Sequence, residues 1–216
     1  IDRCLRDELG DAKLDALVDH LRKLHARQPE ARVVVVAEDN PTTDYLRDAI
    51  EKLTDVKVAK KRRSVSAEEV LEVQITLLKE ALDDFISGEA KVLVAADAAK
   101  EGHNLQFADE IIFFALPWSP PDIQQWIGRI DRLGTKGIPA NRRISITPLV
   151  VEGSIESSIL GVLESTGVFL RSEVFDESEW MDISNAISAA ANGSAGASWI
   201  DAAKQAKSLG EAYDEW

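Results

Sequence analysis

Three short apolar runs most constrain how this chain can fold: Arg32–Ala37, Lys91–Ala96 and Glu110–Ala115. After its first, charged residue each run is continuously apolar, which is typical of a strand buried on both faces of a parallel sheet. Stretches with helical spacing of apolar residues separate the runs. Strands that alternate with helices predict an α/β domain, in which helices cover both faces of a mainly parallel sheet.

The remaining elements are predicted from periodicity and from capping residues. We expect a helix over residues 11–28, with Asp11 as its N-cap, and a loop over residues 38–43. Further helices are expected over residues 44–53, 67–87 and 155–165, and from Ser119-Pro120-Pro121-Asp122 onward. Short strands are expected over residues 56–59 and 144–151, the second at an edge or a bulge because it contains Pro148.

The pattern weakens after about Arg171, so we predict a domain over residues 1–170 and an acidic tail over residues 171–216. The tail is expected to be mostly helical or partly flexible. The chain lacks an initial Met, a signal sequence and an apolar run of about 18 residues. Together with the single Cys4, this predicts a piece of a longer cytoplasmic protein with no membrane partner.

Charge is distributed unevenly along the chain. The net charge of −13 argues against a protein that coats nucleic acid over its whole surface. The segment Lys57–Arg63 nevertheless concentrates five positive charges in seven residues. This segment is either a solvated loop or a local track for a phosphate backbone.

The most specific motif is Gln124-Gln125-Trp126-Ile127-Gly128-Arg129-Ile130-Asp131-Arg132-Leu133-Gly134. On a helix, one face would carry Gln125, Gly128, Arg129 and Arg132, and a different face, with Ile123, Ile127 and Ile130, would suit the core. Two guanidinium groups one turn apart suit a triphosphate in phosphoryl transfer. The alternative is a solvated helix whose arginines pair with carboxylates.

A second polar segment, Ala96–Phe107, directly follows a predicted buried strand. Gly102 allows a close backbone approach, and exposed N–H groups in such a turn can hold an anion. Asn104 can donate and accept hydrogen bonds at once. Taken by itself, the segment can equally be an ordinary polar loop between a strand and a helix.

Together, the two segments resemble motifs V and VI of superfamily-two helicases and translocases. The helix start at Asp11 and the strand Val33–Glu38 look like the entry into the second RecA-like lobe and its motif IV. Val150–Glu156 is similar to the segment after motif VI in Swi/Snf-type remodellers, and motifs V and VI look most like the bacterial RapA-like branch. The resemblance covers about residues 11–166. It implies a three-layer α/β/α RecA-like lobe with a helical C-terminal appendage.

The resemblance also implies roles for individual residues. It makes Arg129 and Arg132 the arginine fingers that reach the γ-phosphate of ATP. The residues expected at the nucleotide are Gln125, Gly102, Asn104 and Gly128. Those expected at nucleic acid are Asn40, Thr42, Thr43, Lys60, Lys61, Arg62, Arg63 and Lys100. Ala96 replaces the Ser or Thr usual early in motif V, so the side chain there offers no hydroxyl to nucleic acid.

The sequence contains no G-x-x-x-x-G-K-[ST] loop, and no Asp-Glu pair ends an apolar strand to hold Mg²⁺. ATP and Mg²⁺ are therefore expected to be held mainly by a first RecA-like lobe of the same polypeptide, and the chain alone should be inactive. The leading hypothesis is the second ATPase lobe of a translocase or helicase acting on double-stranded DNA. The alternatives are the same lobe of an RNA helicase and a non-catalytic interaction platform.

Three further residues attract attention without a strong motif. His20 and His25 are expected to be solvated on the first helix, with no metal between them, since no second pair of ligands exists. Trp118 is expected either to pack or to stack at the mouth of the interlobe cleft.

Overall fold

The computed structural model describes residues 11–59, 80–96, 105–131, 144–170 and 176–192. The chain divides into two compact units. The sheet unit contains residues 1–115 and 129–149, and the helical unit contains residues 116–128 and 150–216. Most of the helix predicted over residues 67–87 lies outside the described residues; its last part, residues 80–87, is helical. The predicted boundary near residue 170 stays a prediction.

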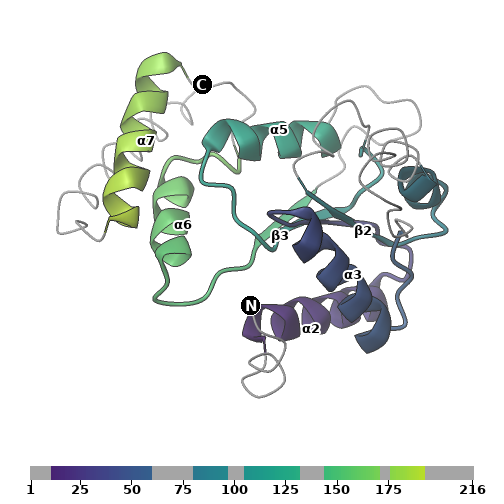
Figure 1. Cartoon of the computed structure of the whole chain (residues 1–216). Coiled ribbons are helices and arrows are strands. Elements are labelled where there is room, and N and C mark those ends of the chain that lie inside the picture. The colour runs from purple at the N-terminus through teal and green to yellow at the C-terminus, as the bar shows by residue number, and fades with distance from the viewer. Residues whose placement is uncertain (1–10, 60–79, 97–104, 132–143, 171–175, 193–216) are drawn as a thin grey trace, which may run out of the picture. The chain divides into compact units, whose positions relative to one another are not determined.

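Four parallel strands form the sheet, in the order β2-β1-β3-β4 (Figure 1). The strands are β1 (Val33–Val36), β2 (Val92–Ala95), β3 (Glu110–Phe113) and β4 (Ser145–Pro148). All four lie within predicted strands, which are confirmed. The strand predicted over residues 56–59 is reduced to a single parallel bridge between Val58 and Val92.

Pro148 lies in β4, which is the last strand in the order of the described sheet. This is the edge position that was predicted from the proline. The backbone N–H groups of Ser145 and Leu149 donate to the carbonyls of Asp109 and Phe113 on the β3 side, at 3.0 Å each. Because alternate residues of a strand point their N–H groups to opposite sides, the nitrogen of Pro148 faces away from β3. The missing N–H therefore costs no hydrogen bond to β3.

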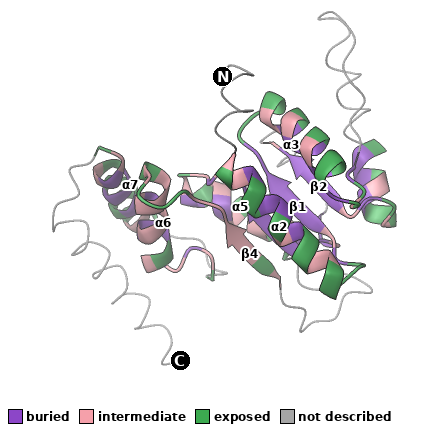
Figure 2. Ribbon diagram, turned by 90° about the horizontal axis from the view of Figure 1, so that it is seen from below, coloured by how far each residue is buried: buried purple, intermediate pink, exposed green. Residues whose placement is uncertain are grey.

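Two helices of the sheet unit, α2 (Ala12–Arg27) and α3 (Asn40–Leu53), cover the same face of the sheet (Figure 2). Asp11 caps α2 as predicted: its carboxylate accepts the N–H of Leu14 at 3.0 Å. The core on this face contains Leu14, Leu17, Val18, Leu21, Val33, Val35, Leu46, Ile50, Val92, Val94, Ile112 and Phe114. Val34, Leu93 and Ile111, whose side chains point to the other face, are also buried.

Helix α3 begins four residues earlier than predicted, so the predicted loop over residues 38–43 is wrong from Asn40 onward. The Asp39 carboxylate accepts the backbone N–H of Thr42 at 2.7 Å and thereby caps the helix. Pro41 stands in the first turn, where the missing N–H of a proline breaks no hydrogen bond. Both residue types are local signals for a helix start here.

The histidines of α2 are half-buried and hydrogen-bonded, so the prediction that they are solvated is wrong. His20 Nε2 lies 2.9 Å from the Glu110 carboxylate, which also accepts the Thr147 hydroxyl. Glu110 is buried at the start of β3. His25 lies close to two carbonyl oxygens, those of Leu21 at 2.9 Å and Ala31 at 3.0 Å. His20 and Glu110 are 90 positions apart in the sequence, and only the folded chain brings them together.

The helical unit contains α6 (Ile155–Ser165) and α7 (Glu177–Ala191), which lie side by side (Figure 1). Helix α6 has the predicted bounds. Helix α7 starts with a capping box, in which Asp176 accepts the N–H of Glu179 and the Glu179 carboxylate accepts the N–H of Asp176. The buried stripe of α7 is Ile183, Ala186, Ile187 and Ala190. None of the described helices has both the length and the apolar character to cross a bilayer.

Helix α5 (Pro120–Ile130) crosses the division between the two units, which falls between Gly128 and Arg129. It starts at the predicted Ser-Pro-Pro-Asp sequence, and the Ser119 carbonyl accepts the N–H groups of Asp122 and Ile123 at 3.0 and 3.2 Å. The helix predicted from this sequence is confirmed.

We predict that Leu21→Ala lowers the free energy of unfolding by about 2–5 kcal/mol, because the Leu21 side chain is 0% exposed and its loss leaves a cavity. The matched control is Leu53→Ala, whose side chain is 43% exposed at the end of α3 and should cost about 0.5 kcal/mol or less. Urea denaturation of both variants measures the difference. Equal effects would contradict the described packing of α2.

Candidate functional site

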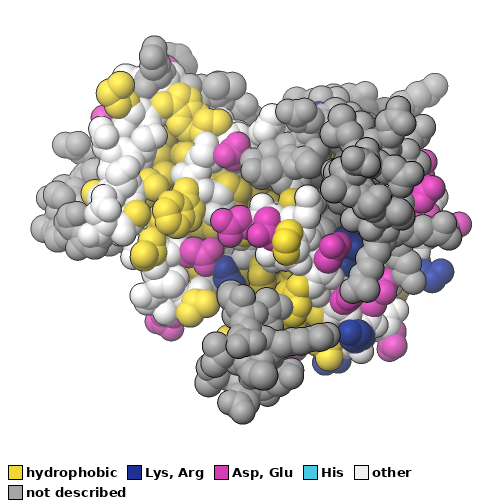
Figure 3. All heavy atoms as spheres, in the orientation of Figure 1, with side chains coloured by type: hydrophobic (Ala, Val, Ile, Leu, Met, Phe, Trp, Pro, Cys, Tyr) yellow, Lys and Arg dark blue, Asp and Glu magenta, His cyan; other side chains and the backbone are white. Residues whose placement is uncertain are grey.

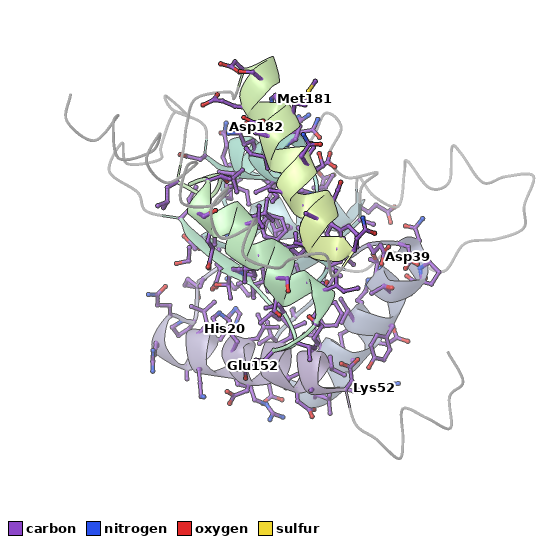
Figure 4. All side chains as sticks on the ribbon, turned by 90° about the vertical axis from the view of Figure 1, so that its left-hand side faces the viewer. His20, Asp39, Lys52, Glu152, Met181 and Asp182 are labelled. Atoms are coloured by element: carbon purple, nitrogen blue, oxygen red, sulfur yellow. The ribbon has the colours of Figure 1, made fainter. Side chains whose placement is uncertain are left out.

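The carboxyl ends of the four parallel strands lie at one edge of the sheet, the edge at which ligands of such sheets bind. At this edge β1 is followed by Asp39 and α3, and β2 is followed by Ala96. Figure 4 shows Asp39 at the N-terminal end of α3 and Lys52 near its C-terminal end. The N-terminus of α3, with the positive end of its dipole, therefore belongs to this edge.

The three predicted nucleic-acid residues of α3 differ in accessibility. Asn40 is exposed and Thr42 is half-buried. Thr43 is only 5% exposed, and its hydroxyl donates to the Asp39 carbonyl at 2.9 Å. The Thr42 side chain also hydrogen-bonds within the helix start, to Asp39. The exposed Asn40 is therefore the best placed of the three to meet a ligand.

The Asp39 carboxylate is held ionised by its own helix. Hydrogen bonds from the Thr42 side chain, and then from the Thr42 backbone N–H, lower the pKa of Asp39 below its ordinary value. A capping carboxylate next to the helix N-terminus partly cancels the positive dipole that an anionic ligand would meet. Anion recognition at this point therefore depends on further donors, such as the Asn40 amide.

A second set of contacts ties the start of α2 to the same edge. Lys13 Nζ donates to the Phe114 carbonyl at 2.9 Å and lies 5.5 Å from the centre of the Phe114 ring. The Tyr45 hydroxyl donates to the Asp11 carboxylate at 3.0 Å and so links α3 to the start of α2. The sequence reasoning missed both contacts, because Lys13 and Tyr45 are typical of any helix surface and only the fold pairs them.

Helix α5 presents the central part of the predicted motif with two distinct sides. Gln125 and Gly128 are exposed and Arg129 is half-buried. The buried side consists of Ile123, Trp126 and Ile130. Ile127 was predicted in the core but is only half-buried, and Trp126 takes its place. With 100° per residue, Trp126 lies between Ile123 and Arg129 around the axis, whereas Ile127 lies on the far side of Ile123.

The end of α5 is joined to the second predicted motif. The backbone N–H of Leu105 donates to the carbonyl of Arg129 at 3.2 Å. This contact brings the end of the segment Ala96–Phe107 to the residue that carries one of the two predicted fingers. Within the described residues, the guanidinium group of Arg129 forms no ion pair. The described residues therefore do not support the alternative in which Arg129 pairs with a carboxylate of this chain.

Several predicted residues lie outside the described parts of the chain. They are Lys60, Lys61, Arg62, Arg63, Lys100, Gly102, Asn104 and Arg132. Trp118 is described and is 47% exposed, so it is not a core residue. Among the described residues no group of three or more His, Cys, Asp or Glu side chains could hold a metal ion.

Acidic side chains are spread across the surface shown in Figure 3. They agree with the net charge of −13. A surface of this sign repels a phosphate backbone, so any contact with nucleic acid depends on local groups of basic and amide side chains.

The chain matches the family described as "Helicase conserved C-terminal domain" over residues 12–134. Two curated relatives are similar to parts of the chain. An uncharacterized ATP-dependent helicase, YqhH of Bacillus subtilis, is 38% identical over 85 residues. The RNA polymerase-associated protein RapA of Vibrio vulnificus is 32% identical over 116 residues.

The match with YqhH covers 39% of this chain and the match with RapA covers 54%. The chain spans only a small part of these relatives, 14% of the length of YqhH and 11% of that of RapA.

Two solved structures are similar in fold. The C-terminal part of the Fun30 ATPase domain matches with a TM-score of 0.55 and 18% identity, over 83% of this chain and 54% of that one. The helicase domain of Hef from Pyrococcus furiosus matches with a TM-score of 0.50 and 22% identity, over 73% of this chain and 30% of that one. At these identities the likeness concerns the fold.

We predict that Asp39→Ala lowers the melting temperature at neutral pH, because the ionised carboxylate caps α3. The folded-state pKa of Asp39 is lowered, so its contribution is complete above the unfolded pKa of about 3.9 and is lost as the pH falls through the folded pKa. The difference between the variant and the parent chain should therefore shrink below about pH 4 in thermal melts.

Asp48→Ala, at an exposed aspartate in the middle of the same helix, is the matched control and should leave the melting temperature nearly unchanged at every pH. A difference between Asp39→Ala and the parent that stays constant down to acid pH would contradict the capping role.

Proposed function

Since the chain belongs to the helicase conserved C-terminal domain family, whose match covers more than half of it, we propose that it is the second ATPase lobe of an ATP-dependent nucleic-acid translocase. The lobe closes on a first RecA-like lobe of the same polypeptide, supplies arginine fingers to ATP bound there, and forms part of the nucleic-acid track. The chain covers only a small part of its relatives, so these whole-protein activities are part of the proposal.

The fold is that of a RecA-like C-terminal lobe of superfamily-two helicases, and the predicted fold class is confirmed. The relatives YqhH and RapA are bacterial proteins, and the first is described as an ATP-dependent helicase. The predicted likeness to the bacterial RapA-like branch is therefore confirmed as well.

The observation that carries the proposal is the hydrogen bond from Leu105 N–H to the Arg129 carbonyl. It joins the two segments whose residues were assigned to the nucleotide, although 24 positions separate the bonded residues (129 minus 105). Arg129, without an ion pair in the described part of the chain, keeps its charge available for a phosphate group. A planar guanidinium suits the oxygens of a transferring phosphoryl group.

In this mechanism the chain supplies two charged arginine side chains and holds them in position. ATP, bound mainly by the first lobe together with Mg²⁺, provides the phosphoryl group that water attacks. Arg129 and Arg132 approach the γ-phosphate when the lobes close and stabilise the charge of the transition state. Because the fingers meet the phosphate only after closure, they affect hydrolysis far more than the first binding of ATP. The exposed Gln125 and Gly128 would lie at the same nucleotide.

Nucleic acid is proposed to follow the residues at the start of α3 and the basic segment. The exposed Asn40 and the half-buried Thr42 stand in the first turn of α3, where the Asn40 amide can donate to a phosphate. The positive charges of Lys60–Arg63 and of Lys100 add the electrostatic attraction that the acidic surface lacks. We favour double-stranded DNA on the likeness to Swi/Snf-type proteins; the same lobe on an RNA track is the alternative.

In a polypeptide that contains this chain and its first lobe, Arg129→Ala or Arg132→Ala should lower kcat for ATP hydrolysis about 10³-fold or more. ATP binding should stay nearly unchanged, because the fingers act after closure. Lys at either position should rescue poorly, since a point charge does not reproduce the planar fork. Steady-state hydrolysis and equilibrium nucleotide binding measure the two effects separately.

Arg27→Ala, at an exposed arginine in the last turn of α2, is the matched control and should keep full activity. The chain without its first lobe should hydrolyse ATP no faster than buffer. Full activity of both finger variants would contradict the finger role of Arg129 and Arg132.

Changing Lys60, Lys61, Arg62 and Arg63 together to Ala should weaken nucleic-acid binding by the two-lobed protein. It should also reduce the slope of log affinity against log salt by about 0.9 for each phosphate of duplex DNA that the variant no longer neutralises. Titrations at several salt concentrations, on DNA and on RNA duplexes, measure the slope and the preferred track. An unchanged slope would identify the segment as a solvated loop.

A further inference from the structure

Trp126 in α5 is the largest fully buried side chain of the described residues, at 0% exposed. Its indole Nε1 is buried and has no hydrogen-bond partner there. A buried indole N–H usually finds a partner, and leaving it without one costs free energy. The ring is therefore held by its packing alone. A hydrogen bond does not explain why a tryptophan stands at this position.

The position of Trp126 relative to Arg129 supplies such a reason. The two residues stand at i and i+3 on the helix, so their Cβ atoms are about 5–6 Å apart. Side chains of a helix lean toward its N-terminus, so the stem of Arg129 extends over the turn that contains Trp126. Arg129 is half-buried, as expected of an arginine whose apolar stem lies along a covered surface while its charged end reaches outward.

We propose that Trp126 is a positioning residue for Arg129. Its ring supports the stem of Arg129 one turn further along the same helix, so that the guanidinium group is held in one direction before the lobes close. The hydrogen bond from Leu105 fixes the backbone of Arg129, and Trp126 fixes the direction of its side chain. The inference rests on the finger role of Arg129 under the proposed function.

An ordinary core tryptophan would contribute to stability without changing the rate of the folded enzyme. A positioning residue changes the rate, because a misplacement of about 1 Å in a catalytic group can cost about 10²-fold. The two roles are therefore separated by measuring kcat, KM for ATP and the melting temperature of the same variants.

The experiment uses the two-lobed protein with Trp126→Ala and Trp126→Phe. Trp126→Ala should lower kcat about 10²-fold and leave KM for ATP within about twofold. Trp126→Phe should recover most of that decrease in kcat, because Nε1 makes no hydrogen bond that phenylalanine would lack. If Trp126→Ala does not fold, Trp126→Leu takes its place, with the same expected decrease in kcat at unchanged KM.

Leu21→Ala in α2 is the control for a loss of core packing away from α5, and it should lower the melting temperature without changing kcat below that temperature. A further test combines Trp126→Ala with Arg129→Ala. If Trp126 acts through Arg129, the double variant should be no slower than Arg129→Ala alone.

Three results would overturn the inference: an unchanged kcat in folded Trp126→Ala, a Trp126→Phe variant as slow as Trp126→Ala, or additive decreases in the double variant. Full activity of Arg129→Ala would instead contradict the proposed function itself. Loss of activity in Arg129→Ala together with full activity in Trp126→Ala would leave the finger role standing and remove only the role of Trp126.

Discussion

The parallel pairing of β1 with β2 on one side and β3 on the other is the constraint on which the rest of the structure depends. Because all strands run the same way, every strand ends at the same edge, and each connection must return across a face of the sheet. The returning helix α3 therefore starts at that edge, where Asp39 and Asn40 lie. The start of α3 and the carboxyl end of β2 lie at the same edge for this topological reason, although the sequence places them far apart.

Helix α5 combines packing and chemistry within eleven residues. One side buries Ile123, Trp126 and Ile130, and the other exposes Gln125 and Gly128. Arg129 stands at the border of the two sides, with its backbone carbonyl bound by Leu105. A side chain at such a border can be held by the core and still reach a ligand. The core of this helix and its proposed catalytic role are therefore linked through neighbouring residues.

Local sequence signals predicted the elements that depend on local physics. The apolar runs indicated the strands β1, β2 and β3, and Asp11 was recognised as the cap of α2 because capping acts over three residues. The start of α3 was misplaced although Asp39 and Pro41 are ordinary start signals, because the polar run was taken for a loop. The capping box of α7, Asp176 with Glu179, was equally visible and was not used.

Long-range contacts could not be predicted in this way. His20 was expected in solvent, and its partner Glu110 is known only once α2 packs on the sheet. On α5, Ile127 was assigned to the buried side, whereas the structure buries Trp126. Both residues lie next to Ile123 around the helix axis, and the pattern of apolar residues does not distinguish the two positions. For the candidate site, the residues of α5 were found by their motif, whereas Lys13 and Tyr45 carry no signal of their own.

The outward-facing nitrogen of Pro148 has a consequence for the behaviour of this lobe in solution. An unpaired strand edge is a template on which a second chain can add a strand, and such growth leads to aggregation. Proline removes one donor from the outer side of β4 and leaves the bonds to β3 intact. A substitution by valine would restore that N–H without disturbing the bonds to β3. The free energy of unfolding would hardly change, but the outer edge of β4 could pair more readily with a strand of a second chain.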